Sequence, residues 1–278
     1  MELLDRKDYV KATSALSKMT INNLFARSVL EGKITGKVYA DNKLSPTTFY
    51  ILHPYGMSLL LGNSSNHQFN EQFKNHALNT GKNRQRYEWM QVFPDSWNPV
   101  LATLLGDQLV KLEDNEEDLQ AGIVELNNRV NFKFNKEKFL LTKLIQPAGN
   151  EDIAIVQTDA VLFREMKGSV TPADFWDSEQ DFLKNGFAYS LLYQGKLAAT
   201  AFSACWFGEL FELGIETNPE FRGQGFARLV CTKLIEFCIQ QGYEPLWACR
   251  QANTGSYQLA LKLGFDVSSI TPYYRLSK

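Results

Sequence analysis

The feature that most constrains the fold of this chain is the segment at residues 217–227, TNPEFRGQGFA, in which a glycine-rich turn joins a strand pattern to a helix pattern. Before the turn, residues 211–217 alternate with the two-residue period of a half-buried strand. After it, apolar residues recur at intervals of three and four over residues 226–241, which predicts an amphipathic helix. Gly223 and Gly225 leave the junction without side chains, so backbone N–H groups and the positive end of the helix can approach an anion. The segment therefore predicts a phosphate-binding turn.

Two common nucleotide-binding motifs are excluded by the residues around this turn. A dinucleotide fingerprint needs a third glycine and an acidic residue about twenty positions later, but Ala227 takes the last small position and the helix pattern continues. A P-loop needs a Gly-Lys-Ser/Thr ending, which the turn lacks. For the motif taken alone, a tight strand-to-helix connection without any ligand is the alternative interpretation.

The spacing of Arg222, Gly225 and Ala227 resembles the pyrophosphate-binding turn of the GNAT acyltransferase superfamily. A second segment, NTGSYQLALKLGF at residues 253–265, resembles the other diagnostic part of that superfamily, an asparagine after a strand, a helix and a closing Leu-Gly-Phe. The resemblance implies an α/β (α+β) protein with a GNAT fold in its C-terminal half. It also implies that Asn253, which is a good helix N-cap in any family, binds the pantetheine chain of acetyl-CoA.

The order of the predicted elements in the C-terminal half agrees with that fold. Two helices precede three strands and the glycine turn, and a strand, a helix and a strand follow the long helix. The predicted elements are a strand at 139–144, helices at 153–166 and 172–185, strands at 187–193, 197–207 and 211–217, a helix at 226–241, a strand at 245–250, a helix at 255–263 and a strand at 265–276.

The first half of the chain repeats part of this order. Its predicted elements are a helix at 7–31, strands at 36–41, 47–53 and 57–61, a helix at 68–78, a strand at 87–93, a helix at 96–105 and a strand at 122–134. At the place of the phosphate turn the sequence reads LGNSSNHQF, without the Arg-x-x-Gly-x-Ala spacing. We therefore expect two domains, residues 1–136 and 137–278, the first being a smaller, degenerate GNAT-like domain that shapes the substrate cleft. The linker is expected near residues 135–138.

A narrower resemblance is carried by FELGIETNPEFRGQGFARLV, EPLWACRQAN, SYQLALKLGF and PYYRL. Together these segments resemble the zwittermicin-resistance-type acetyltransferases over about residues 175–276, and the likeness is looser before them. This resemblance implies transfer of an acetyl group to a primary amine of a small molecule of the aminopolyol or antibiotic-like kind. Two alternatives stay open: a non-catalytic acyl-CoA-binding or protein-interaction module, and an acetyltransferase for protein lysines or N-termini.

The resemblance to the GNAT superfamily implies acetyl-CoA as co-substrate, held by the strand end, the glycine turn and the start of the last helix. The cofactor-binding residues expected on this basis are Ile215, Glu216, Thr217, Arg222, Gly223, Gln224, Gly225, Phe226, Ala227, Asn253 and Ser256.

Acetyl transfer to an amine needs a base, because an alkylammonium has a pKa of about 10.4, whereas the leaving thiol, at about 8.5, needs less help. Glu212 and Glu216 share one face of the predicted strand, so either can take the proton directly or through water. For each of them a structural or solvated role is the alternative. Gly214 between them indicates either a bulge that frees a backbone donor for the thioester carbonyl or relief of crowding.

The residue that protonates the thiolate departs from the family pattern. Many GNAT enzymes place a tyrosine seven residues beyond the asparagine, where this chain has Ala260. Tyr257 lies about one helical turn earlier and is the substitute that we favour, with Ser256 and Tyr273 as weaker candidates. Donation by water is a further alternative.

Composition narrows the remaining classes. The chain has 278 residues, 44% of them hydrophobic, which is ample for two cores. A formal net charge of −2 gives no electrostatic footprint for nucleic acid or a membrane surface. The four cysteines lack metal-ligand spacing, and the sequence shows neither a signal core nor a run long enough to span a bilayer. We therefore expect a cytoplasmic protein with reduced thiols and no metal, and leave open whether it forms a homodimer.

Overall fold

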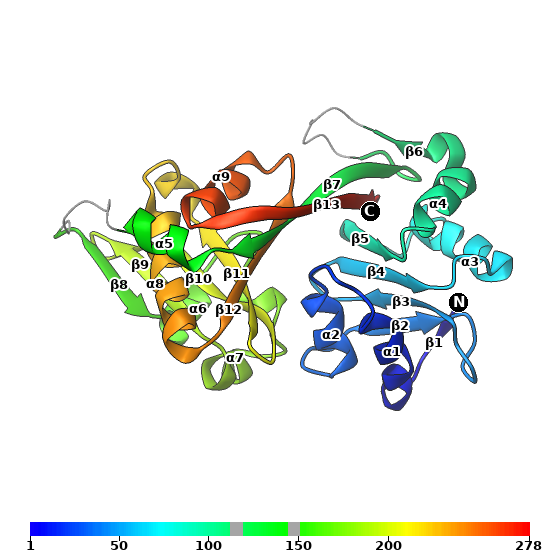
Figure 1. The fold of residues 1–278 in the computed structure, drawn as a ribbon, viewed down its shortest axis with the longest axis horizontal. Coiled ribbons are helices and arrows are strands. Elements are labelled where there is room, and N and C mark those ends of the chain that lie inside the picture. The colour runs from blue at the N-terminus through cyan, green and yellow to red at the C-terminus, as the bar shows by residue number, and fades with distance from the viewer. Residues whose placement is uncertain (112–118, 144–150) are drawn as a thin grey trace. The chain divides into compact units, whose positions relative to one another are not determined.

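The computed structural model describes residues 1–111, 119–143 and 151–278, and within them the chain forms two compact units (Figure 1). Unit 1 comprises residues 1–130, 250–252 and 269–278, and unit 2 comprises residues 131–249 and 253–268. Two long strands, β7 (Val124–Phe134) and β13 (Phe265–Leu276), contribute to both units. The chain therefore passes from one unit to the other inside strands as well as through loops.

Unit 1 is built on a sheet with the strand order β1-β2-β3-β4-β5-β13-β7. The β2–β3 and β3–β4 pairs are antiparallel, whereas β4 and β5 are parallel and are joined by a crossover that contains α3. The elements are β1 (Glu2–Leu3), η1 (Arg6–Ala12), α1 (Thr13–Leu16), α2 (Leu24–Leu30), β2 (Lys37–Ala40), β3 (Thr48–Leu52), β4 (Met57–Gly62), α3 (His67–Ala77), β5 (Glu88–Phe93), α4 (Trp97–Leu105), η2 (Gly106–Gln108) and β6 (Leu109–Val110). Its core packs α3 and α4 against the sheet around the buried Trp97, Tyr50 and Phe73.

Unit 2 has the strand order β13-β7-β12-β11-β10-β9-β8. Again two antiparallel pairs, β9–β10 and β10–β11, precede a parallel pair, β11–β12, whose crossover contains α8. The elements are α5 (Lys136–Lys143), β8 (Ile153–Gln157), α6 (Ala160–Glu165), η3 (Pro172–Asp174), α7 (Glu179–Asn185), β9 (Ala188–Tyr193), β10 (Lys196–Phe207), β11 (Leu210–Thr217), η4 (Pro219–Phe221), α8 (Phe226–Gln241), β12 (Glu244–Arg250) and α9 (Thr254–Lys262).

Alternate residues of β11 face opposite sides of the unit 2 sheet. Phe211 packs on Tyr243 and on Phe187, which in turn contacts Phe237 of α8. On the other side, Phe202 of β10 packs on Phe175, at the end of η3. Because side chains alternate along a strand, Glu212, Gly214 and Glu216 belong to the η3 side.

The mixed α/β class and most predicted elements are confirmed, α8 and β13 with the predicted bounds. Four predicted elements are wrong. Residues 139–144 were expected to be a strand, but 136–143 form the helix α5, because Asn135 caps the Lys138 N–H and only Phe139 is buried while Leu140 and Leu141 are exposed. The helix expected at 153–166 is strand β8 followed by the short α6, which Asp159 caps.

The third wrong element is the long helix expected at residues 7–31. The structure breaks it into η1, α1 and α2, with a non-helical stretch before α2. The helix expected at 172–185 is likewise split into η3, which has a capping box of Thr171 and Asp174, and α7. The order β8-α6-α7-β9-β10-β11-α8-β12-α9-β13 has the β-α-α-β-β-β-α-β-α-β form that the sequence predicted, but its first strand is β8 and not the segment at 139–144.

Candidate active site

The predicted phosphate turn lies between the end of β11 and the start of α8. Gly223 and Gly225 have φ angles of +78° and +82°, which only glycine adopts freely, and a Cβ atom at either position would meet nothing within 4 Å. Phe221 and Phe226 flank the turn, and both rings pack against Tyr193 of β9. The aromatic contacts hold the two ends of the turn, so its glycines remain open on the outside.

The backbone N–H groups of this turn have no partners within the described part of the chain. From Gly223 to Ala227 no N–H group finds an acceptor there, and Gly225 caps α8 without a side-chain hydrogen bond. The first N–H groups of a 16-residue helix carry its positive partial charge. These donors fit a pyrophosphate, which is the group that the sequence predicted for this turn.

Next to the turn, β11 and β12 separate. Their parallel pairing covers only residues 210–212 and 244–246, although β11 continues to Thr217 and β12 to Arg250. β11 stays paired with β10 up to Thr217, so β12 is the strand that departs. Asn218 donates its N–H to Ala198 of β10, and the alternation of an antiparallel ladder then turns the N–H groups of Leu213 and Ile215 away from β10. The open edge of β11 thus offers backbone donors beside the turn.

Of the two roles predicted for Gly214, the structure shows relief of crowding. A Cβ atom at Gly214 would lie 2.3 Å from the ring of Phe202, its partner in β10. The irregular pairing in this ladder falls in β10 instead, between Ser203 and Cys205. The bulge expected at Gly214 is therefore absent from β11, and the edge opens because β12 departs.

Glu216 lies at the end of β11 with its carboxylate engaged on both oxygens. Oε2 accepts from the N–H groups of Ser169 and Val170, at 2.9 and 3.1 Å, and Oε1 accepts from the Thr217 N–H at 3.2 Å. Oε1 also pairs with the Arg222 guanidinium at 3.3 Å. The loop at residues 168–170 is a part of the site that sequence reasoning missed, because only a glycine–serine turn signal marks it.

Glu212, the other candidate base, lies two residues before Gly214 on the same face. Its side chain is buried, and the residue sits opposite Cys205 of β10 and Leu246 of β12, at the last point where β11 and β12 pair. It is therefore placed where the two strands begin to separate. The catalytic role of either glutamate stays a prediction.

The α9 segment places the remaining predicted residues. Asn253 caps the helix by accepting the Ser256 N–H at 3.1 Å, and the Ser256 hydroxyl accepts from the Trp247 indole N–H. Tyr257 is half-buried, with its ring 5.5 Å from that of Phe132 and no recorded hydrogen bond from its hydroxyl to a described residue. Ala260 is fully buried, so a core contact replaces the family tyrosine. Tyr273, the weaker acid candidate, is buried in unit 1 against Trp89 and Arg129.

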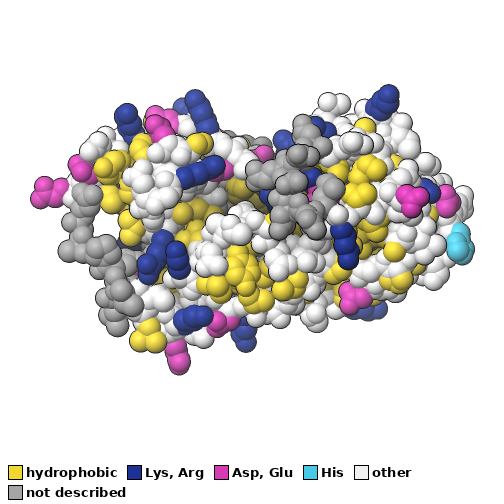
Figure 2. Space-filling view, turned by 90° about the horizontal axis from the view of Figure 1, so that it is seen from above, with side chains coloured by type: hydrophobic (Ala, Val, Ile, Leu, Met, Phe, Trp, Pro, Cys, Tyr) yellow, Lys and Arg dark blue, Asp and Glu magenta, His cyan; other side chains and the backbone are white. Residues whose placement is uncertain are grey.

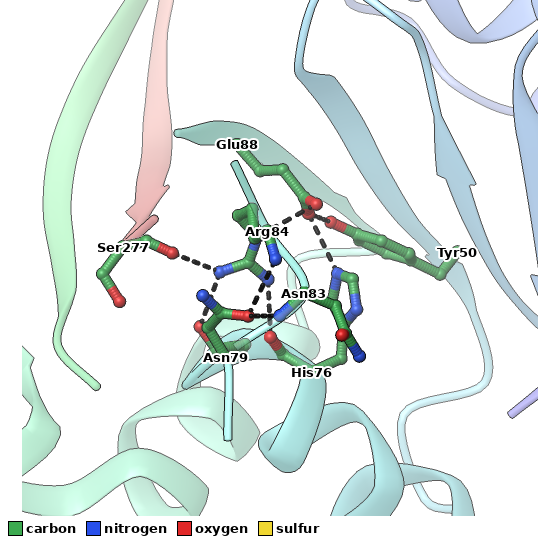
Figure 3. Close-up of polar contacts among 8 residues, drawn as sticks. Tyr50, His76, Asn79, Asn83, Arg84, Glu88 and Ser277 are labelled. Carbon is green, nitrogen blue, oxygen red and sulfur yellow. Dashed lines mark hydrogen bonds and ion pairs between the residues drawn. The ribbon is translucent and has the colours of Figure 1, made fainter. Parts of the chain in front are cut away.

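Unit 1 contains a separate buried polar cluster (Figure 3). The Glu88 carboxylate accepts from the Tyr50 hydroxyl and pairs with Arg84 at 3.0 Å and with His76 at 2.9 Å. Burial alone would raise the pKa of Glu88, but the hydrogen bond and charge of His76 and the charge of Arg84 outweigh burial and hold this pKa at about 2. Arg84 also donates to the Ser277 carbonyl at 2.6 Å, so the cluster ties the end of the chain into unit 1.

The surface carries charges of both signs, with lysine and arginine side chains interspersed among aspartate and glutamate on the face seen in Figure 2. Among the described residues, no helix is long and apolar enough to cross a membrane, and no three potential metal ligands gather. The four cysteines are buried, and none of them forms a disulfide bond with another described residue.

The fold agrees with that of known proteins. The sequence model of the GNAT acetyltransferase family matches residues 15–274, so this chain belongs to that family and is an acyltransferase of the N-acetyltransferase kind, whose members use acetyl-CoA. It is similar to YdfB, an uncharacterized N-acetyltransferase of Bacillus subtilis (strain 168), with 27% identity over 251 residues that cover 90% of this chain and 89% of the relative.

Solved structures share the fold. A GCN5-related N-acetyltransferase-like protein from Streptococcus suis superposes with a TM-score of 0.69 at 18% identity, covering 96% of this chain and 98% of that one. A tandem GNAT protein from the clavulanic acid biosynthesis pathway gives a TM-score of 0.58 at 9% identity, with 98% and 95% coverage. Both likenesses extend over nearly the whole chain, including unit 1.

Proposed function

We propose that this chain binds acetyl-CoA at the turn of residues 222–227 and transfers the acetyl group to a primary amine of a small molecule. The observation that carries the proposal is the coincidence of two openings in unit 2. The turn presents N–H groups at the start of α8 that have no acceptor among the described residues, and β12 no longer pairs with the edge of β11 beside it. One opening suits a pyrophosphate and the other suits the amide and thioester groups that follow it in an extended chain.

In this proposal the N–H groups of Gly223 to Ala227 and the Arg222 guanidinium hold the pyrophosphate, while Asn253 and Ser256 approach the pantetheine chain. The bound co-substrate supplies the acetyl group as a thioester. The Ile215 N–H, turned to the open edge, donates to the thioester carbonyl and stabilises the negative charge that develops on its oxygen. Carbonyl polarisation thus comes from the backbone, and binding comes from the backbone together with the Arg222, Asn253 and Ser256 side chains.

The proton balance assigns roles to side chains. Glu212 takes a proton from the ammonium, directly or through water, since at neutral pH only about one such amine in a thousand is free base. The amine nitrogen then bonds to the carbonyl carbon, the C–S bond breaks, and the acylated nitrogen loses its second proton to water. The thiolate accepts a proton from water, or from Tyr257, which then regains one from water. Glu212 is preferred to Glu216 here because it is buried at the point where β11 and β12 begin to separate, whereas Glu216 binds the loop at residues 169–170 and Arg222.

The acceptor that we propose is an aminopolyol or an antibiotic-like amine, in line with the likeness of residues 175–276 to the zwittermicin-resistance-type enzymes. Unit 1 is proposed to be a degenerate copy of unit 2 without a cofactor site, and the shared order of strand pairing supports this. The cytoplasm remains the proposed compartment.

Release of CoA thiol from acetyl-CoA, followed across a panel of aminopolyols, aminoglycosides, polyamines and lysine-containing peptides, tests this function. We expect turnover with at least one small amine and none above background with peptides. Turnover confined to peptides would contradict the small-molecule acceptor. Binding of acetyl-CoA without turnover on any amine would instead indicate a non-catalytic acyl-CoA-binding module.

A further inference from the structure

One carboxylate in unit 2 joins two segments that are far apart in the sequence. Glu216 Oε2 accepts from the backbone N–H groups of Ser169 and Val170 and, at 3.4 Å, from the Ser169 hydroxyl. Its other oxygen, Oε1, accepts from the Thr217 N–H and pairs with Arg222. One oxygen therefore serves the loop between α6 and η3, and the other serves the strand end and the phosphate turn.

The surroundings of this carboxylate are shaped to hold it. Its side chain is only 10% exposed, whereas that of its partner Arg222 is 61% exposed. Gly168 has a φ of +150°, and a Cβ atom on it would lie 2.4 Å from the Glu216 carboxyl carbon. Any other residue at position 168 would displace either the loop or the carboxylate, so the loop fits this one side chain.

The contacts leave Glu216 poorly suited to accept a further proton donor. An ionised carboxylate has about four lone-pair sites, and the donors of Ser169, Val170, Thr217 and Arg222 occupy them. A general base needs a free site within hydrogen-bond reach of the amine. We call this arrangement, in which Glu216 binds both the loop at residues 168–170 and the phosphate turn, the Glu216 clamp.

We propose that Glu216 is a positioning residue that couples the cofactor turn to the loop at residues 168–170. The inference rests on the proposed acetyl-CoA site. Arg222 and Thr217 flank that site, so a pyrophosphate that orders the exposed Arg222 side chain also orders Glu216, and through Oε2 the loop. The loop lies on the η3 side of the sheet, the same side as Glu212, and therefore borders the face on which we place the acceptor amine.

Hydrogen exchange of the Ser169 and Val170 amides, measured without substrates, tests the clamp directly. Glu216→Gln keeps the size of the side chain but removes the charge and one acceptor oxygen, so the Ser169 and Val170 N–H groups either lose their acceptor or keep a weaker, uncharged one. We expect these amides to exchange at least about tenfold faster in the variant. Glu220→Gln, which removes an exposed charge four residues away, is the matched control and should leave both amides unchanged. Equal exchange in wild type and a folded Glu216→Gln variant overturns the proposal.

Addition of acetyl-CoA adds the coupling measurement. In wild type it should slow exchange at Ser169 and Val170 further, and in Glu216→Gln it should slow exchange at the turn alone. Gly168→Ala approaches the clamp from the loop side and guards against a folding defect in the glutamate variant. It should also uncouple the loop, and a loop that is still protected by acetyl-CoA in both variants overturns the coupling.

Kinetics separate positioning from base catalysis. For a positioning residue, both variants raise KM for the amine by about tenfold, while the rise of kcat with pH keeps its shape. Loss of that pH dependence in Glu216→Gln, with an unchanged KM, would make Glu216 the base and overturn the proposal. The exchange measurements need no turnover, so a failure of the proposed activity would remain distinguishable from a failure of the clamp.

Discussion

The crossovers β4–α3–β5 of unit 1 and β11–α8–β12 of unit 2 follow the same plan and differ where a ligand would bind. In each, an antiparallel pair leads into a strand, a turn, a helix and a parallel strand. In unit 1, residues 57–61 of β4 pair with residues 89–93 of β5, which is nearly the whole length of both strands. In unit 2 the pairing of β11 with β12 stops after residue 212. The two parallel strands joined by the crossover thus stay paired in unit 1 and separate in unit 2.

The turns that follow β4 and β11 also differ, in whether their backbone N–H groups find acceptors. In unit 1, Asn63 donates its N–H to Thr47 and accepts the Ser65 N–H on its side chain, and the Asn66 side chain caps the Phe69 N–H. In unit 2 the corresponding donors have no acceptor among the described residues. The comparison teaches that the fold alone does not make a cofactor site. The site requires backbone donors that the chain itself leaves unused.

The largest expected effect comes from filling the open turn of unit 2. Gly225→Asp places a carboxylate where we propose that the pyrophosphate binds, and like charges in such contact cost several kcal/mol, which is about a thousandfold in affinity. Calorimetry with acetyl-CoA measures this loss. Gly208→Asp is the matched control, since Gly208 also has a positive φ, +57°, and open space around it. Unchanged affinity in a folded Gly225→Asp variant would remove the turn from the cofactor site.

A substitution of Gly62, the last residue of β4 before the unit 1 turn, should act in a different way. At Gly62, with φ +100°, a Cβ atom would lie 2.2 Å from the Thr47 carbonyl oxygen. Gly62→Ala is therefore expected to lower the free energy of unfolding by several kcal/mol, as overpacking and backbone strain do. Thermal unfolding measures it, and a variant as stable as wild type would contradict the closed-turn description.

The next two predictions compare a buried glutamate of unit 2, Glu212, with a buried glutamate of unit 1, Glu88. Glu212→Gln should lower kcat by about a hundredfold near neutral pH, with the loss shrinking at high pH where free amine is plentiful. The pH–rate profile from pH 6 to 9 measures it, and Glu209→Gln, at an exposed position before β11, is the control. A wild-type profile in Glu212→Gln would move the base to water.

Glu88 in unit 1 is expected to act on stability alone. Its pKa in the folded protein, about 2, lies below the ordinary glutamate value of 4.5, so its contribution to stability is present above about pH 4.5 and is lost as the pH falls toward 2. Glu88→Gln should remove about 2 kcal/mol of stability at pH 7 and flatten the acid limb, because the shift bounds the effect at about 3 kcal/mol and the amide keeps some hydrogen bonds. Denaturant unfolding between pH 2 and 7 measures this, with Glu71→Gln on the exposed face of α3 as control. An unchanged acid limb would contradict the assignment.

The smallest expected effect is at Tyr257. Removing its hydroxyl in Tyr257→Phe keeps the packing on Phe132, and water can protonate a thiolate whose pKa is within about two units of neutrality, so the rate should fall at most about tenfold. Steady-state kinetics at saturating acetyl-CoA measure the change, and Tyr243→Phe is the control. A full wild-type rate would make Tyr257 structural.

Much of the fold followed from periodicity because the long elements are strongly patterned. The bounds of α8 came from a clear three–four repeat and from Gly242, which takes a left-handed φ at its end. The segment at 139–144 was misread because a short apolar run fits a strand or a helix equally, and only the burial of Phe139 with exposure of Leu140 decides it. Local patterns do not contain that information.

The candidate site also has parts that the sequence predicted and parts that it did not. The glycine turn is local, so the sequence predicted its open donors. The short pairing of β11 with β12 and the contact of Glu216 with the loop at 168–170 both involve residues that lie about 35 to 50 positions apart in the sequence. No short sequence pattern predicts such contacts. Parity placed Glu212 and Glu216 on one face, but it could not show that one of them is already surrounded by donors.

The last strand has a consequence for how the protein is made. Residues 274–276 of β13 pair with β5, and Arg84 binds the Ser277 carbonyl, so residues more than 180 positions after β5 complete the sheet of unit 1. A ribosome that adds about 5–20 residues per second reaches them roughly ten to forty seconds after it has passed β5. During that interval the nascent unit 1 holds an unpaired strand edge, the kind of surface that chaperones cover and that premature termination would leave exposed for good.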